Sequence, residues 1–199
     1  PQGGIRSPTA ASMALDGLEQ RLRARFHARD KVNLVRYADD FIIGFEREDD
    51  ARRVMAVLGK RFERFGLKLH PDKTRLVDAT RPGGFDVLGY HFERGQKLPR
   101  RQALDRFKGK ARERTPRSSG ESMEATIASL NDMLRGWFGY FKHSSRDRLD
   151  GLDSYIRGRL RSILRKRMGR RGRGRGYDHQ RWRNHYFDEL GLFSLTRAH

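Results

Sequence analysis

Two adjacent carboxylates are the residues best placed for metal chemistry. Asp39 and Asp40 end the segment Tyr37-Ala38-Asp39-Asp40, which lies between two runs of β-branched and aromatic residues. Phosphoryl transfer by two Mg²⁺ ions requires clustered carboxylates on a rigid turn, because these ions prefer oxygen ligands. An isolated Asp-Asp pair is more often a plain solvated β-turn, since Asp is a common turn former. The surrounding sequence has to decide between these two interpretations.

A dense run of cations is the second candidate site. From Arg157 to Arg175 there are ten basic residues and no acidic ones. Such runs are often solvated helix faces, but a one-sign run this dense repels itself unless a polyanion neutralises it. Arginine can bridge phosphates and stack on unpaired bases, and glycines 172, 174 and 176 would let the loop mould to irregular RNA. We expect RNA contacts from Arg157, Arg161, Arg165, Lys166, Arg170, Arg171, Arg173 and Arg175.

The overall charge also points to a polyanionic partner. The 199 residues include 44 Lys and Arg against 25 Asp and Glu, a formal net charge of +19. Residues 1–99 hold 19 basic and 14 acidic residues, whereas residues 100–199 hold 25 and 11, so the second half is the electrostatic anchor. Without cysteine, disulfides and Cys-based zinc sites are excluded.

The chain shows no sign of a membrane or secreted protein. No apolar run approaches the roughly 20 residues needed to span a bilayer. The chain begins with Pro1, without an initiator Met or a targeting segment, so we expect it to start inside a longer protein. We expect a soluble, cytoplasmic protein with no membrane partner.

The elements that would position the carboxylates are mixed helix and antiparallel sheet. Helical periodicity predicts helices over 8–28 and 49–65. The segment 31–45 suggests two strands around a tight acidic turn, with the aspartates at the hairpin tip. Short strands are predicted over 67–77 and 85–92, separated by proline and glycine breakers.

The second half changes character. A basic stretch over 100–120 ends in a Pro, Ser and Gly cluster and is interpreted as a connector. Helices are predicted over 121–142, with Ser118 and Glu121 as a capping box, and over 147–167. A short third helix contains Trp182, Tyr186 and Leu190 and stops at Gly191. The aromatic residues of the first of these helices are expected in the core; they are Trp137, Phe138, Tyr140 and Phe141.

Several segments, taken in order, resemble successive motifs of reverse transcriptases. Their order and spacing match, and the Pro-Gln-Gly-Gly and Tyr-Ala-Asp-Asp forms resemble the group II intron branch more than retroviral or retron enzymes. Residues 137–141, 182–187 and 191–195 resemble the maturase thumb of that family. The motif-like segments are Pro1-Gln2-Gly3-Gly4-Ile5-Arg6-Ser7-Pro8, Leu34-Val35-Arg36-Tyr37-Ala38-Asp39-Asp40-Phe41, Lys73-Thr74 and Leu88-Gly89-Tyr90.

The resemblance implies an α+β fold. It would consist of a partial reverse-transcriptase palm, with helices packed on a small antiparallel sheet, followed by an all-α basic thumb or maturase domain. The corresponding domains would be the palm part over 1–99, the basic connector over 100–120 and the helical maturase domain over 121–199.

The resemblance also implies roles for individual residues. Asp39 and Asp40 would bind catalytic Mg²⁺. Lys73 would lie near the leaving pyrophosphate, although a surface lysine after a Pro-Asp turn is an equally good interpretation. Leu88 and Gly89 would belong to the primer grip, with a plain strand and bulge as the alternative. The incoming nucleotide would be lined by Gln2, Gly3, Gly4, Tyr37 and Ala38, since glycine lets the backbone approach closely.

Two functions follow from these features. The first is an RNA-directed DNA polymerase and intron maturase, with Mg²⁺, an RNA template, a DNA primer, deoxynucleoside triphosphates and group II intron RNA as cofactor and partners. The alternative is a non-catalytic RNA-binding splicing factor, a maturase remnant. Relatives take a further Mg²⁺ ligand from an aspartate upstream of Pro-Gln-Gly-Gly, so we expect the parent protein to polymerise DNA and this fragment alone to be inactive.

Overall fold

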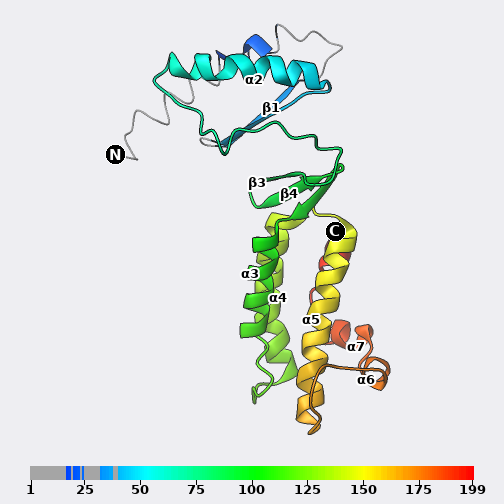
Figure 1. Ribbon diagram of the computed structural model, residues 1–199. Helices are drawn as coiled ribbons and strands as arrows, with labels where there is room; N and C mark the ends of the chain where they lie inside the picture. Colours follow the sequence, from blue (N-terminus) through cyan, green and yellow to red (C-terminus); the bar gives the residue numbers. More distant parts are fainter. Residues whose placement is uncertain (1–16, 19, 23, 25–31, 38–39) are drawn as a thin grey trace. The chain divides into compact units, whose positions relative to one another are not determined.

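The chain divides into two compact units, Pro1–Val77 and Asp78–His199. The computed structural model describes residues 17–18, 20–22, 24, 32–37 and 40–199 (Figure 1). The expected helix over 8–28 lies largely outside these residues, and its described part is helical.

The first unit contains a hairpin and one long helix. Strands β1 (Asn33–Tyr37) and β2 (Asp40–Gly44) pair in antiparallel fashion, as expected. Helix α2 (Glu48–Glu63) begins with three acidic residues, which interact favourably with the helix dipole. Phe62 of this helix stacks on Phe41 of β2, with ring centroids 5.6 Å apart. The hairpin and the helix therefore share an apolar core, whose buried members are Leu18, Leu22, Val54, Leu58 and Phe62.

The predicted strand over 67–77 is wrong. These residues form turns and irregular structure. The backbone N–H groups of Lys73 and Thr74 both donate to the His70 carbonyl, at 3.2 and 2.9 Å, so the segment bends back at Pro71. Proline lacks the N–H that a sheet requires and fixes φ, which favours a turn here.

The second unit opens with a three-stranded antiparallel sheet in the order β3-β4-β5. Its strands are β3 (Phe85–Val87), β4 (Tyr90–Glu93) and β5 (Gln96–Pro99). The predicted single strand over 85–92 is a hairpin, because Leu88 and Gly89 both have positive φ, 47° and 79°. Two consecutive residues with positive φ form the tight turn that suits two-residue hairpins.

Three long helices follow the sheet. They are α3 (Arg101–Glu113), α4 (Met123–Phe141) and α5 (Arg146–Arg167). The two last agree closely with prediction, but Ser122, rather than Ser118, caps α4 by accepting a 3.0 Å hydrogen bond from the Ala125 N–H. The stretch over 100–120, expected to be a connector, is mostly helix α3, whose Phe107 is buried in the core.

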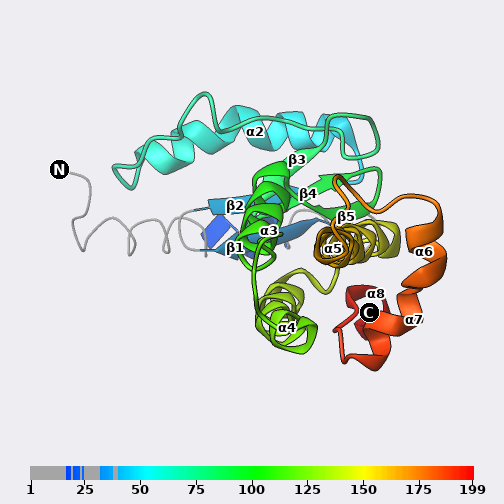
Figure 2. The same ribbon diagram turned by 90° about the horizontal axis from the view of Figure 1, so that it is seen from below.

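The chain ends in three short helices on one side of α5. They are α6 (Tyr177–Arg181), α7 (Asn184–Glu189) and α8 (Leu195–Ala198). The single helix expected around Trp182 is thus two, with the break at that residue. In Figure 2, α4 and α5 are seen nearly end-on and α8 lies beside them, in agreement with the contacts of α8 with both helices.

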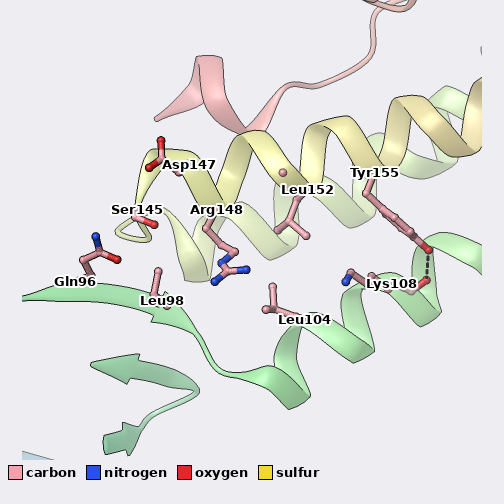
Figure 3. A pocket seen from close by; sticks show the side chains of 10 residues that line it. Gln96, Leu98, Leu104, Lys108, Ser145, Asp147, Arg148, Leu152 and Tyr155 are labelled. Carbon is pink, nitrogen blue, oxygen red and sulfur yellow. Dashed lines mark hydrogen bonds between the residues drawn. The ribbon is translucent and has the colours of Figure 1, made fainter. Parts of the chain in front are cut away.

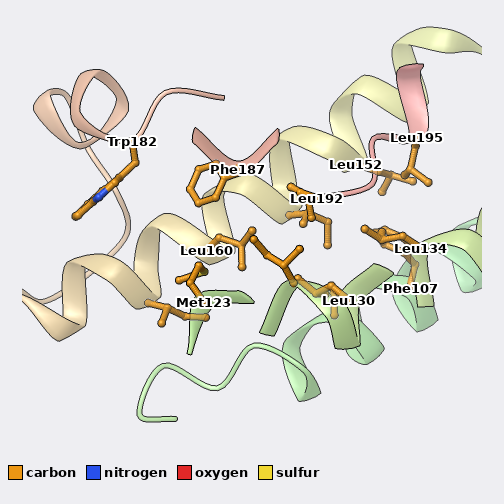
Figure 4. Close-up of a cluster of buried hydrophobic side chains, with 14 of the residues drawn as sticks. Phe107, Met123, Leu130, Leu134, Leu152, Leu160, Trp182, Phe187, Leu192 and Leu195 are labelled. Atoms are coloured by element: carbon orange, nitrogen blue, oxygen red, sulfur yellow. The ribbon is translucent and has the colours of Figure 1, made fainter. Parts of the chain in front are cut away.

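One apolar cluster holds this second unit together (Figure 4). Leu130 and Leu134 of α4 are fully buried against Leu160 of α5, and Phe187 and Leu195 bring the C-terminal helices onto the same cluster. Full burial of each such side chain contributes about 1.5–3 kcal/mol. Among the described residues, no helix is long and apolar enough to cross a membrane.

Candidate nucleic-acid interface

The acidic hairpin tip is partly described. Asp40 is the first residue of β2 and pairs with Tyr37, the last residue of β1, so two residues separate them. Both Asp40 and Tyr37 are exposed. The structure therefore places Asp40 at the hairpin end, as predicted. Five other expected site residues lie outside the described part of the chain, namely Gln2, Gly3, Gly4, Ala38 and Asp39.

One described residue at this tip has a donor type that suits magnesium. The exposed carboxylate of Asp40 is the oxygen ligand that Mg²⁺ prefers. The part of the chain that the structure describes holds no group of three or more His, Asp or Glu side chains able to bind a metal. Lys73 lies in the exposed turn after Pro71, and among the described residues no hydrogen bond or ion pair joins it to Asp40. The described residues therefore supply one possible ligand and do not complete a cage.

The Leu88-Gly89 turn, expected in the primer grip, is anchored to helix α4. The Tyr140 hydroxyl donates to the Leu88 carbonyl at 2.6 Å, and the Tyr90 hydroxyl donates to the Tyr140 carbonyl at 2.6 Å. A Cβ added at Gly89 would lie 3.5 Å from the Tyr140 ring and 3.6 Å from the Phe141 ring. Burial raises the pKa of Tyr90, so this hydroxyl stays protonated as a donor. The turn is fixed in position by two reciprocal hydrogen bonds.

Burial divides the residues predicted to bind RNA into two groups. Arg157 and Arg161 face inward. Only 8% of Arg157 and 5% of Arg161 is exposed. Arg161 donates to the Trp182 carbonyl at 2.9 Å and to Asn184 Oδ1 at 2.7 Å. Burial lowers the pKa of Arg161, and the nearby Arg157 cation lowers it further. This burial disfavours RNA contact by these two arginines. Arg161 instead ties α5 to the C-terminal helices, and Arg157 Nη2 lies 4.0 Å from the Asp188 carboxylate of α7. Arg161 also lies over the Phe187 ring, 5.3 Å from its centroid.

Arg165 also has partners within the protein. Its Nη1 donates to the Asp178 carboxylate at 2.5 Å, and its Nε donates to the Arg171 carbonyl at 2.9 Å. The remaining predicted residues of the run have exposed side chains on the end of α5 and on the Gly/Arg loop, residues 169–176, which is the orange segment joining α5 to α6 in Figure 1. They are Lys166, Arg170, Arg171, Arg173 and Arg175.

Two protein-family models match the chain, one in the region of the acidic hairpin and one in the region of the Gly/Arg loop. Residues 1–92 match the reverse transcriptase (RNA-dependent DNA polymerase) family, and residues 104–184 match the maturase-specific domain of group II introns. The chain belongs to the group II intron-encoded reverse transcriptases and maturases. No curated protein matches it.

The two candidate sites of this group II intron protein fall in different family regions. The acidic hairpin belongs to the reverse-transcriptase match, and the Gly/Arg loop belongs to the maturase match. The β3–β4 hairpin, except for its last residue Glu93, lies inside the reverse-transcriptase match but packs with the maturase helices in the second compact unit. The family boundary and the structural boundary therefore differ in this protein.

A groove of about 510 Å³ lies between β5, α3 and α5 of the maturase region (Figure 3). Its lining includes Leu104 and Leu152 together with the cations Lys108 and Arg148, and the Tyr155 hydroxyl donates to the Lys108 carbonyl at 3.4 Å. The groove is partly apolar and has fewer cations than the Gly/Arg loop. The loop is therefore the stronger candidate for contact with a polyanion.

Sequence reasoning missed residues that act within the fold. Asp178 is 2% exposed, and Asp153 is 4% exposed. Asp153 accepts hydrogen bonds from the Ser194 hydroxyl and from the Leu195 and Thr196 N–H groups, at 2.6, 3.0 and 3.1 Å. Trp182, whose role the sequence left open, is a buried core residue. An acid next to a long basic run was the available signal for Asp178, whereas nothing in the sequence singled out Asp153.

Proposed function

We propose that this protein is an RNA-directed DNA polymerase whose maturase region binds group II intron RNA and thereby favours splicing. The observation that carries the RNA-binding part is the group of exposed cations at the end of α5 and on the Gly/Arg loop, among them Lys166, Arg170, Arg171, Arg173 and Arg175. An RNA backbone presents regularly spaced phosphates, and arginine side chains that reach solvent can neutralise them. Asp178, the acidic residue that follows the loop in the sequence, is buried and paired with Arg165. The exposed surface of the loop is therefore of one sign.

For the polymerase part, we propose that Asp39 and Asp40 hold magnesium. The chemistry that magnesium supplies at such carboxylates is activation of a primer hydroxyl and neutralisation of phosphate charge. Lys73 would contact the leaving pyrophosphate, and Leu88 and Gly89 would position the DNA primer. The deoxynucleoside triphosphate would lie against Gln2, Gly3, Gly4, Tyr37 and Ala38, across from the RNA template.

The RNA-binding part is tested by measuring affinity for a labelled RNA stem-loop at several salt concentrations. We expect affinity to fall steeply with salt, because binding releases counterions from the phosphates. The fourfold variant Arg170→Gln, Arg171→Gln, Arg173→Gln, Arg175→Gln should bind more weakly, and its log–log salt slope should shrink by about one for each phosphate that the variant no longer neutralises.

A matched variant controls for net charge. It replaces four exposed cations of the first unit by glutamine and removes the same charge: Arg47, Lys60, Arg64 and Arg75. The proposal expects this variant to retain more affinity than the loop variant. A flat salt response, or equal losses of affinity in the two variants, would contradict RNA binding through the loop.

The polymerase part is tested by primer extension on an RNA template with the protein as its gene encodes it. Asp40→Asn should abolish Mg²⁺-dependent extension, because the neutral amide is a poor ligand for the ion. The control Asp49→Asn changes an exposed acid at the start of α2 and should extend normally. Splicing support without any extension activity would instead identify a non-catalytic RNA-binding splicing factor.

A further inference from the structure

Two hydrogen bonds tie the Gly/Arg loop to the helices beneath it. Its Arg171 carbonyl accepts a 2.9 Å hydrogen bond from Arg165 Nε. Its Arg175 N–H donates a 2.9 Å hydrogen bond to the Asp178 carboxylate. Arg165 and Asp178 are themselves joined at 2.5 Å, so one partly buried ion pair holds both ends of the segment 171–175.

The middle of the loop lies directly against α5. A Cβ added at Gly174 would lie 3.1 Å from the Arg161 Cβ and 3.8 Å from the Asp178 Cβ. The loop backbone therefore rests on the stem of a buried arginine, at a distance that leaves little room for any larger residue. The sequence suggested that the glycines would let this loop mould to RNA; the packing instead gives the loop one defined course.

The charged side chains of the loop point away from these ties. Arg171, Arg173 and Arg175 are exposed although the Arg171 carbonyl and the Arg175 N–H are engaged below. A loop fixed in this way holds its cations at set spacings before any ligand arrives, so binding does not have to order the loop.

We propose that the ion pair of Arg165 and the buried Asp178 is a positioning device that pre-forms the Gly/Arg loop as a cradle for the phosphates of structured RNA. This inference rests on the proposed RNA-binding function. It assigns Asp178, an acidic residue, a role that strengthens binding to a polyanion. Long-range electrostatics alone predicts the opposite, because a negative charge near the site repels phosphate.

The test is the affinity of the full chain for a labelled RNA stem-loop, with two variants of the pair. Asp178→Asn raises the net charge by one and should weaken binding by about threefold or more, through loss of preorganisation. Arg165→Lys keeps the charge but lacks the guanidinium fork that reaches both partners, and it should weaken binding similarly.

Two control variants match these changes. Asp150→Asn removes an exposed acid from α5, and Arg146→Lys makes the same conservative change as Arg165→Lys at the far end of α5. Asp150→Asn should bind RNA slightly more tightly and Arg146→Lys should bind normally. Tighter binding by Asp178→Asn together with normal binding by Arg165→Lys would overturn the proposal and leave loop charge as the sole determinant.

A second readout reports loop order without RNA. Trypsin cleaves after arginine, and a loop held in one conformation resists cleavage more than a mobile one. We expect trypsin to cleave Asp178→Asn and Arg165→Lys faster than the parent chain within residues 170–175. The rate of cleavage at other sites and the temperature of thermal unfolding should change less than the rate of cleavage in the loop. Unchanged cleavage within the loop would overturn the positioning role even if affinity fell.

The fourfold glutamine variant separates this inference from the proposed function. If that variant binds RNA as well as the parent chain does, the loop is not an RNA site and both ideas fail. If that variant is impaired while Asp178→Asn and Arg165→Lys bind normally, RNA binding stands and only the positioning device fails.

Discussion

The hydroxyl of Tyr140 donates a 2.6 Å hydrogen bond to the backbone carbonyl of Leu88. This bond joins a helix of the maturase region to a turn that belongs, by sequence, to the reverse-transcriptase region. The Tyr90 hydroxyl returns a hydrogen bond of 2.6 Å to the Tyr140 carbonyl. The proposed primer-grip turn and helix α4 are therefore coupled, and a displacement of the helix would move the turn.

The Tyr140 hydrogen bond can be tested by its effect on stability. Tyr140→Phe removes the hydroxyl and keeps the ring, so it should lower the free energy of unfolding by about 0.5–1.5 kcal/mol, the usual contribution of one hydrogen bond. Denaturant titration measures the change. Tyr177 is exposed to a similar degree, 68% against 55% for Tyr140, but its hydroxyl has no hydrogen-bond partner among the described residues, so Tyr177→Phe should leave stability unaltered. Equal effects of the two changes would show that the Tyr140 bond is not formed in solution.

The C-terminal helix α8 depends on one buried acid. Asp153 receives three hydrogen bonds from the start of that helix. Asp153→Ala leaves those donors without a partner, and each unsatisfied buried group costs about 1–3 kcal/mol. We expect a large loss of stability, together with rapid amide exchange at Leu195 and Thr196. Slow exchange there in Asp153→Ala would mean that apolar packing alone holds α8.

The arginines of α5 and of the Gly/Arg loop should separate into structural and RNA-binding groups. Arg161→Gln removes a buried guanidinium that bonds Trp182 and Asn184, so it should lower the free energy of unfolding by about 1.5–3 kcal/mol, as expected for hydrogen bonds to charged groups. Arg173→Gln changes an exposed side chain and should stay within about 0.5 kcal/mol of the parent. When both variants are folded to the same extent, Arg173→Gln should lower RNA affinity more than Arg161→Gln does. A destabilised Arg173→Gln would contradict the division by burial.

The Asp178 carboxylate should make stability depend on pH. The hydrogen bond from the Arg175 N–H lowers the pKa of Asp178 below the ordinary value of 3.8. Burial alone would raise this pKa, but the hydrogen bond and charge of Arg165 and the charge of Arg170 also lower it. A lowered pKa in the folded state means that ionised Asp178 stabilises the fold above pH 3.8, and that this contribution is lost as the pH falls through the folded-state pKa. The difference in melting temperature between the parent and Asp178→Asn should therefore narrow on acidification. A difference in melting temperature that stays constant as the pH falls below 3.8 would contradict an ionised Asp178.

Local patterns in the sequence predicted those elements that local chemistry determines. The β-branched and aromatic residues on either side of the acidic turn predicted the β1–β2 hairpin, and the apolar stripe from Ile127 to Leu134 predicted α4. The segment 67–77 has strand-like composition, but Pro71 and the turn at His70 prevent sheet pairing. Helix α3 was missed because its few apolar residues, chiefly Phe107, are sufficient once tertiary packing buries them.

The candidate site was predictable in composition and only partly in geometry. The density of cations marked residues 157–175 as a polyanion surface, and net charge is readable from sequence. Which arginines reach solvent was not readable, because it depends on α6 and α7 folding back over α5. Arg157 and Arg161 face α6 and α7 and are buried, whereas Arg170 and Arg173 are exposed.

Photochemical crosslinking of the chain to an RNA stem-loop, followed by peptide mass spectrometry, tests the central claim most directly. We predict crosslinked peptides from residues 166–177, where Tyr177 and Met168 are exposed beside the cations. These crosslinks should disappear in the fourfold glutamine variant. Crosslinks confined to α2, or unchanged in that variant, would contradict an RNA interface on the Gly/Arg loop.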